Sequence, residues 1–150
     1  MEFHVEDDPD PLDIGSRETQ IRREACAAMG LGERPSWRSS CAMRAGSSGF
    51  TGWTWGNGCD LQSLWVEPSH RGRWLGLKLI AVAEAEAAKR GCTQTVHFTY
   101  DFQAPRLYEW AGYELVGRVD DFPSGASVRW YRKRLNPPVV PPNRRATARR

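Results

Sequence analysis

The sequence lacks the features of membrane, secreted and zinc-binding proteins. No apolar run reaches the roughly 18 residues that a membrane-spanning helix needs. The N-terminal stretch 1–13 is acidic and has no apolar core, unlike a secretory signal peptide. The four cysteines, at positions 26, 41, 59 and 92, form no C-x-x-C pair, so we expect no metal site. These absences predict a reduced, cytoplasmic protein whose cysteines are small core residues.

The sequence also has little net charge once its last residues are set apart. The formal net charge is +3, but residues 136–150 contain four arginines and no acid, and positions 1–135 hold 17 basic and 18 acidic residues. We therefore predict one domain at 1–135, large enough for a modest core, and a disordered Pro/Arg-rich tail at 136–150. Four arginines are few for binding a phosphate backbone, so nucleic acid is not the partner we expect.

The order of apolar patterns and turn residues indicates helices packed on a sheet. Strands are expected at 3–7, 39–44, 50–56, 59–66, 95–100, 113–120 and 126–135, and helices at 16–29, 74–90 and 104–111. The pair Asn57-Gly58 predicts a tight hairpin turn, because both residues tolerate positive φ. The second helix should face inward with Leu75, Leu79, Val82, Ala83 and Ala87. We predict an α/β (α+β) fold with a mixed, mostly antiparallel sheet of six to seven strands and helices on both faces.

The stretch from Leu64 to Leu77 joins the end of a strand to the start of a helix. A helix N-terminus leaves backbone N–H groups unpaired and carries partial positive charge, and a glycine-bearing turn can bring these groups against a diphosphate. Arg71 and Arg73 add full positive charges nearby. A diphosphate-binding turn is one interpretation, and an ordinary turn with two solvated arginines is the other.

Two motifs resemble those of a known family. The run Val66-Glu-Pro-Ser-His-Arg-Gly-Arg-Trp-Leu-Gly-Leu77 is similar to V-x-P-x-x-R/Q-G-x-G-x-G/A, the acetyl-CoA signature of the GCN5-related N-acetyltransferase (GNAT) family. The run Asp101–Tyr113 is similar to the family's N-x-x-A-x-x-L/F-Y-x-x-x-G-F/Y. One signature position departs, since Trp74 stands where the family has glycine, which lets the backbone approach phosphate closely.

The resemblance implies an enzyme that moves an acetyl group from acetyl-CoA to a primary amine of a small molecule or peptide, by direct attack in a ternary complex. It implies that Leu64, Trp65 and Val66 offer backbone groups to the pantetheine arm, with the Val66 N–H polarising the thioester. The diphosphate would be wrapped by Arg71, Gly72, Arg73, Trp74, Leu75, Gly76 and Leu77. Asp101 stands where the family often has an asparagine near the cofactor. Tyr108 matches the general acid that protonates the departing thiolate.

Several assignments stay open at the level of sequence. Glu67 is our candidate for the base that accepts the amine proton, with Asp60 and His97 as alternatives, and each is also explained as a solvated or structural residue. The departure at Trp74 leaves a catalytically degenerate GNAT-fold protein that binds a ligand or partner as the alternative function. The remaining tryptophans are read as core residues, with Trp53, Trp55 and Trp65 as an alternative acceptor groove and Trp110 and Trp130 as alternative homodimer contacts. The pattern does not choose the acceptor amine.

Overall fold

The computed structural model describes residues 11–30 and 48–136. The chain divides into two units at the boundary between Pro35 and Ser36, and each is described by itself. In the first unit, helix α1 spans Pro11–Ala28 and is followed by Gly30 in the left-handed region, at φ +62°. The helix begins earlier than the predicted residue 16, because Pro11 is well suited to a first helical position. Across these described ranges, no helix is both long and apolar enough to span a bilayer.

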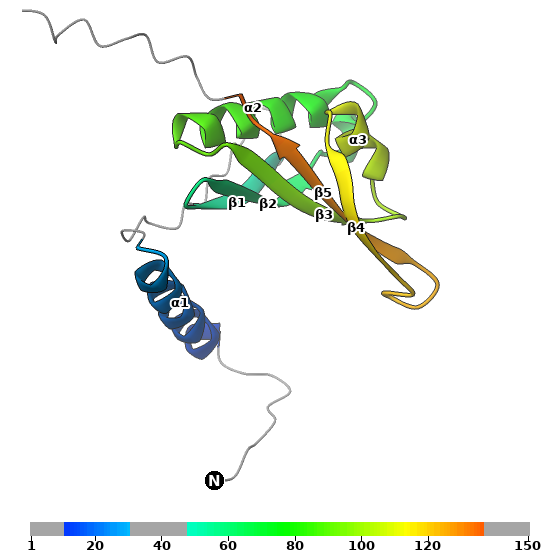
Figure 1. Ribbon diagram of the computed structural model, residues 1–150. Coiled ribbons are helices and arrows are strands. Elements are labelled where there is room, and N and C mark those ends of the chain that lie inside the picture. The colour runs from blue at the N-terminus through cyan, green and yellow to red at the C-terminus, as the bar shows by residue number, and fades with distance from the viewer. Residues whose placement is uncertain (1–10, 31–47, 137–150) are drawn as a thin grey trace, which may run out of the picture. The chain divides into compact units, whose positions relative to one another are not determined.

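The second unit is a five-stranded sheet that carries two helices (Figure 1). Its strands are β1 (Gly49–Trp55), β2 (Gly58–Trp65), β3 (Gln94–Tyr100), β4 (Glu114–Asp120) and β5 (Ser127–Arg134), in the spatial order β1-β2-β3-β5-β4. Helix α2 spans Leu75–Lys89 and helix α3 spans Pro105–Trp110. All neighbouring strands are antiparallel except β2 and β3, which are parallel.

The fold class is confirmed, and the described sheet has fewer strands than expected. The two other predicted strands, at 3–7 and 39–44, lie outside the described residues, as do positions 137–150 of the predicted tail. Both α2 and α3 pack against the same buried cluster and therefore cover one face of the sheet. Because both lie on one face, these two helices do not account for the predicted helices on both faces of the sheet.

The hairpin between β1 and β2 turns one residue earlier than predicted. Trp55 pairs with Gly58, so the two turn residues are Gly56 and Asn57, and Gly58 already belongs to β2. Gly56 has φ +56°. A glycine with positive φ at the first turn position is typical of a type II′ turn. Gly56 therefore supplies the positive φ that we assigned to Gly58. Asn57 instead bonds outward, with Nδ2 donating to Thr93 Oγ1 at 3.1 Å.

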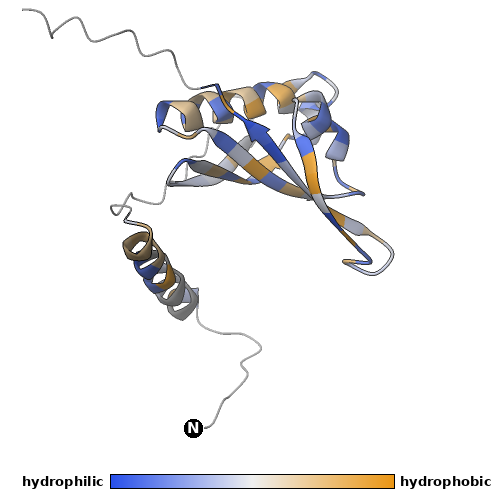
Figure 2. Cartoon of the chain, in the orientation of Figure 1, coloured by the Kyte–Doolittle hydropathy of each residue, from blue (hydrophilic) through white to orange (hydrophobic). Residues whose placement is uncertain are grey.

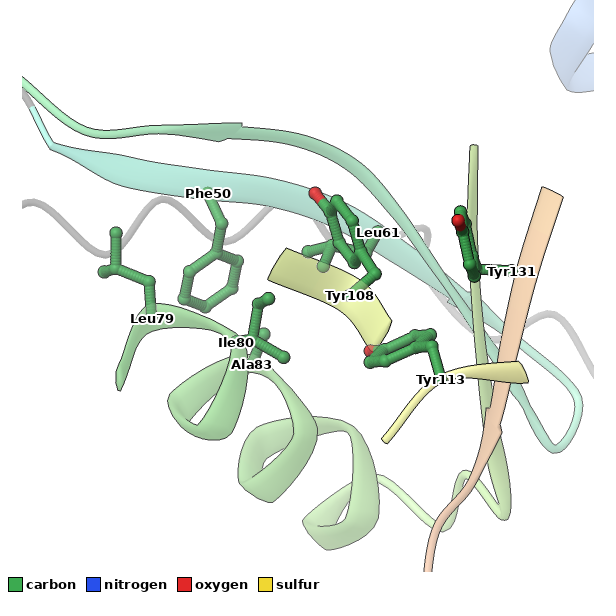
Figure 3. Close-up of a cluster of buried hydrophobic side chains, with 8 residues drawn as sticks. All are labelled: Phe50, Leu61, Leu79, Ile80, Ala83, Tyr108, Tyr113 and Tyr131. Carbon is green, nitrogen blue, oxygen red and sulfur yellow. The ribbon is translucent and has the colours of Figure 1, made fainter. Parts of the chain in front are cut away.

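The core lies between α2, α3 and the helix-covered face of the sheet. Figure 2 shows apolar residues concentrated along α2 and alternating along the strands. Figure 3 shows the central cluster, in which side chains from α2 and the strands converge with three tyrosine rings. The buried residues of α2 are Leu79, Ile80, Ala83 and Ala87. The prediction for Val82 was wrong, since it is 47% exposed, because Ile80 and not Val82 flanks the buried 79–83–87 stripe.

Two of the four cysteines line a second core cluster with Ala87 and Leu135. Cys59 and Cys92 are fully buried, which confirms their predicted role as core residues, whereas Cys41 lies outside the described residues. Burial, with smaller contributions from Cys92 and Asp60, raises the pKa of the Cys59 thiol to about 12. A thiol in this state is an inert core group and not a nucleophile.

Candidate active site

The two parallel strands at the centre of the sheet separate part-way along their length. Ladder pairing joins Gly58–Asp60 of β2 to Gln94–Val96 of β3 and ends there. Beyond that point β2 stays paired with β1, and β3 stays paired with β5 as far as Tyr100. We call this opening between residues 61–65 and 97–100 the fork. The edge of β2 that faces β3 here has no strand partner among the described residues, so an extended ligand can pair with it as an added strand.

The chain leaves β2 at Trp65 and reaches α2 through a tight turn rich in unpaired amides. After Arg71, whose N–H donates to the Pro68 carbonyl, the next backbone N–H with a backbone acceptor in the described chain is that of Lys78, which donates to Trp74 O at 3.2 Å. The N–H groups of residues 72–77, which we call the amide run, therefore have no such acceptor. They lie at the positive end of the α2 dipole, and the first turn of α2 contains no acid.

Trp74, at the second glycine position of the signature, is the N-cap of α2 and has a left-handed backbone. Its φ is +59° and its ψ is +16°, in the left-handed region where glycine is favoured. Trp74 is 64% exposed, and its indole contacts the ring of Trp110 on α3, with centroids 5.7 Å apart. The chain thus follows the course expected of a glycine there, at a cost of about 1–2 kcal/mol for a residue with a Cβ.

Gly76 is fixed by packing. A Cβ at this position would lie 3.0 Å from Cδ2 of Leu107 on α3, tighter than ordinary van der Waals contact. The missing side chain lets α3 approach the first turn of α2, and α3 carries Tyr108. Gly76, at the last glycine position of the signature, therefore couples the position of the tyrosine to the start of α2, which also carries part of the amide run.

The two arginines of the turn have different surroundings. Arg71 folds back, with Nε donating to the Val66 carbonyl at 2.9 Å and the guanidinium carbon 4.9 Å from the Trp65 ring centroid. Arg71 therefore braces the end of β2 against the turn, and its charge stays beside residues 65 and 66. Arg73 is exposed within the amide run. Both charges favour an anion at this end of α2.

Tyr108 lies beneath the fork and is 4% exposed. Its ring stacks on His97 with centroids 4.2 Å apart, and meets Tyr113 edge-on at 5.7 Å. Burial raises the pKa of the Tyr108 phenol, so the hydroxyl keeps its proton at neutral pH. Figure 3 shows the ring rising from α3 toward Leu61 of β2, which borders the fork. A protonated phenol in this place is suited to donate a proton to a leaving group.

His97, which the sequence offered as an alternative base, lies at the fork. Its side chain is 5% exposed, and Nδ1 hydrogen-bonds the carbonyl of Leu61, the first β2 residue beyond the paired segment. Burial lowers the pKa of the His97 imidazole, although the Leu61 carbonyl acts in the opposite direction. The ring is therefore neutral at pH 7, with the proton on Nδ1 and the lone pair on Nε2.

The structure places the two remaining predicted site residues differently. Glu67 follows the end of β2 at the start of a short 3-10 helix, Pro68–His70, and its backbone N–H donates to Ser48 Oγ at 2.8 Å. The carboxylate of Asp101 accepts bonds from the N–H and the Oγ–H of Ser127, at 3.1 and 3.0 Å. Desolvation acts to raise the pKa of Asp101, but the bonds from Ser127 outweigh it and hold that pKa low. Asp101 thus ties the end of β3 to the start of β5.

A family model described as Acetyltransferase (GNAT) domain matches residues 41–115, which include the fork, the amide run and α3. The chain belongs to the GNAT family. This GNAT chain is 33% identical over 136 residues to "Blasticidin-S acetyltransferase" of Streptomyces morookaense, an alignment that covers 87% of this chain and 93% of the relative.

Solved structures agree with this assignment. A protein of Agrobacterium tumefaciens superposes with a TM-score of 0.78 at 28% identity, over 90% of this chain and all (100%) of that one. A Bacillus anthracis protein, solved in complex with acetyl coenzyme A, shares the fold with a TM-score of 0.58 at 14% identity, over 73% of this chain and 68% of that one. The family model and the relative thus show an acetyltransferase of the GNAT type, a family whose acetyl donor is acetyl-CoA.

Proposed function

We propose that this GNAT acetyltransferase transfers the acetyl group of acetyl-CoA to a primary amine of a small molecule, by direct attack within a ternary complex. The observation that carries the proposal is the amide run at residues 72–77, which residues 66–71 join to the open edge of β2. An acyl donor with a diphosphate and an extended amide-bearing arm needs both features, side by side along the chain.

The amide run is proposed to hold the diphosphate. Hydrogen bonds from N–H groups to charged oxygens contribute about 1.5–3 kcal/mol each, and the positive end of the α2 dipole adds about 0.3–1 kcal/mol. Gly72 has φ +73°, and a Cβ built on it would meet nothing within 4 Å. Its side of the turn is therefore open to a ligand. Trp74 does not obstruct this role, because its backbone is left-handed and its indole is turned to Trp110.

The end of β2 is proposed to align the arm of the donor. Leu64 and Trp65 pair with Phe50 and Gly49 of β1 on one side, so that a ligand can add only on the side of the fork. The Val66 carbonyl is engaged by Arg71, which leaves the Val66 N–H as the group proposed to polarise the thioester carbonyl. Acetyl-CoA supplies an activated acetyl group with a thiolate as its leaving group.

Tyr108 is proposed to protonate that departing thiolate. Its phenol is held protonated by burial, and its ring lies at the closed end of the fork, stacked on His97. Glu67 is proposed to accept the proton that an ammonium must lose before the amine can attack, through a water molecule. This assignment rests on its position at the end of β2, next to Val66.

The acceptor is proposed to be an amine-bearing antibiotic related to blasticidin S. The support is the relative named as a blasticidin-S acetyltransferase, of which this chain covers nearly the whole length. The test measures thiol release from acetyl-CoA with blasticidin S, an aminoglycoside, a polyamine and a peptide with a free N-terminus. We expect turnover with blasticidin S above that with the three other amines. Turnover with the peptide alone would refute the small-molecule assignment, and silence with all amines despite acetyl-CoA binding would refute this acceptor class.

A further inference from the structure

His97 occupies the point at which the parallel ladder of β2 and β3 ends. The last paired residues are Asp60 and Val96, so His97 and Leu61 are the first residues beyond the pairing on their strands. In a continuing ladder, main-chain groups of β3 would bond to main-chain groups of β2. Here the carbonyl of Leu61 instead bonds to a side chain, the imidazole of His97. A ring thus stands where a strand-to-strand bond would otherwise form.

The same ring also contacts the proposed acid. The imidazole stacks on the Tyr108 ring with centroids 4.2 Å apart and planes inclined by 27°. On β5, Tyr131 pairs with His97 in the sheet register and stacks on Tyr108 at 6.1 Å. Tyr131 is itself fixed, since its hydroxyl donates to Glu109 of α3 at 2.9 Å. His97 and Tyr131 therefore support Tyr108 from two neighbouring strands.

We propose that His97 is a positioning residue, which sets the fork by bonding the Leu61 carbonyl and fixes the Tyr108 ring beneath it. The inference rests on the proposed role of Tyr108 as proton donor. The imidazole has two separate parts in this role. The Nδ1–H group bonds the Leu61 carbonyl and keeps β2 separated from β3 by the width of a side chain. The ring face sets the orientation of the Tyr108 phenol.

The two parts can be separated by two substitutions at the same position. Asparagine places its Nδ2–H₂ close to the place of the histidine Nδ1–H, so His97→Asn keeps a donor for the Leu61 carbonyl and loses the stacking face. His97→Phe keeps a flat ring against Tyr108 and leaves the buried Leu61 carbonyl without its donor. The measurements are kcat, KM for acetyl-CoA, the dissociation constant of acetyl-CoA by calorimetry, and the melting temperature of each variant.

We expect the two variants to fail in different ways. His97→Phe should raise the dissociation constant and the KM for acetyl-CoA about tenfold or more, because the buried Leu61 carbonyl loses its donor and β2 moves to satisfy it. His97→Asn should bind acetyl-CoA within about threefold of the wild type and lose kcat about 10–100-fold, because a displacement near 1 Å costs about that much. Equal binding and equal kcat in both variants and the wild type would overturn the proposal.

A pH profile and a double variant distinguish positioning from acid–base chemistry. The acidic limb of kcat/KM should keep its apparent pKa in His97→Asn; its disappearance would make His97 the base and would overturn the positioning role. In the Tyr108→Phe background, His97→Asn should lower kcat by less than about threefold, because the two residues act as one unit. If His97→Asn lowered kcat in that background as much as it does in the wild type, His97 would not act through Tyr108. If Tyr108→Phe alone left kcat unchanged, the proposed acid would fail, while the effect of His97→Phe on acetyl-CoA binding would still test the fork.

Discussion

Replacement of Trp74 tests whether the turn before α2, which contains the amide run, is left-handed at this residue. The residue has φ +59°, where any side chain with a Cβ costs about 1–2 kcal/mol. Trp74→Gly and Trp74→Ala both remove the contact with Trp110, so that loss cancels when the two variants are compared. Glycine relieves the strain, but its greater conformational freedom in the unfolded chain lowers the stability by about 0.4–1 kcal/mol. Trp74→Gly should therefore be more stable than Trp74→Ala by about 0.8 kcal/mol.

This order reverses the usual one for a helical residue. Ala81 lies exposed within α2, and Ala81→Gly should destabilise the protein by about 1 kcal/mol. Urea unfolding gives each free energy, and thermal unfolding should separate the two Trp74 variants by about 2–4 °C. If Trp74→Ala were as stable as Trp74→Gly or more stable, which is the order expected at position 81, the turn would not be left-handed. We also expect Trp74→Gly to bind acetyl-CoA within about threefold of the wild type, because the backbone course is already that of glycine.

Three further substitutions probe the tyrosine, the helix contact and the buried histidine. Tyr108→Phe should lower kcat about 10²–10⁴-fold with the acetyl-CoA dissociation constant within about twofold, and an unchanged kcat would remove Tyr108 as the acid. Gly76→Val should destabilise by about 1–3 kcal/mol, because its side chain would press on Leu107, and a neutral result in urea unfolding would contradict that packing. The folded pKa of His97 is depressed, so the unfolded state binds more protons and stability should fall as pH drops below about 6.5, by up to about 1.4 kcal/mol per pH unit. His97→Asn should flatten this dependence in melting temperatures taken from pH 7.5 to 5.

Local patterns in the sequence were sufficient to predict most of the sheet unit. Alternation and turn residues located β1 to β5 to within one or two residues, and the apolar stripe located α2. The errors were also local. The hairpin turn moved by one residue because Gly56 and Gly58 flank Asn57, and either glycine can supply a positive φ. Val82 was misplaced because a helix of alanines and leucines offers two overlapping stripes.

The contacts that give the candidate site its geometry join residues far apart in the chain. The bond from His97 to the Leu61 carbonyl and the contact between Trp74 and Trp110 each depend on the packing of separate elements. No spacing rule encodes them. The sequence did indicate a steric conflict at Trp74, where a bulky side chain stands in place of glycine. The indole avoids the turn because α3 carries an aromatic ring on which it packs. Asp101 shows the same limit, since it lies just after β3 and its partner Ser127 begins β5.

The most direct test of the account is a calorimetric titration with acetyl-CoA and, in parallel, with S-acetylpantetheine, which has the same reactive arm and no diphosphate. The amide run predicts saturable binding of acetyl-CoA, and binding of S-acetylpantetheine that is weaker by at least tenfold, equivalent to about 1.4 kcal/mol. Equal affinity for the two thioesters, or no heat from acetyl-CoA at millimolar concentration, would contradict the claim that residues 72–77 hold the diphosphate.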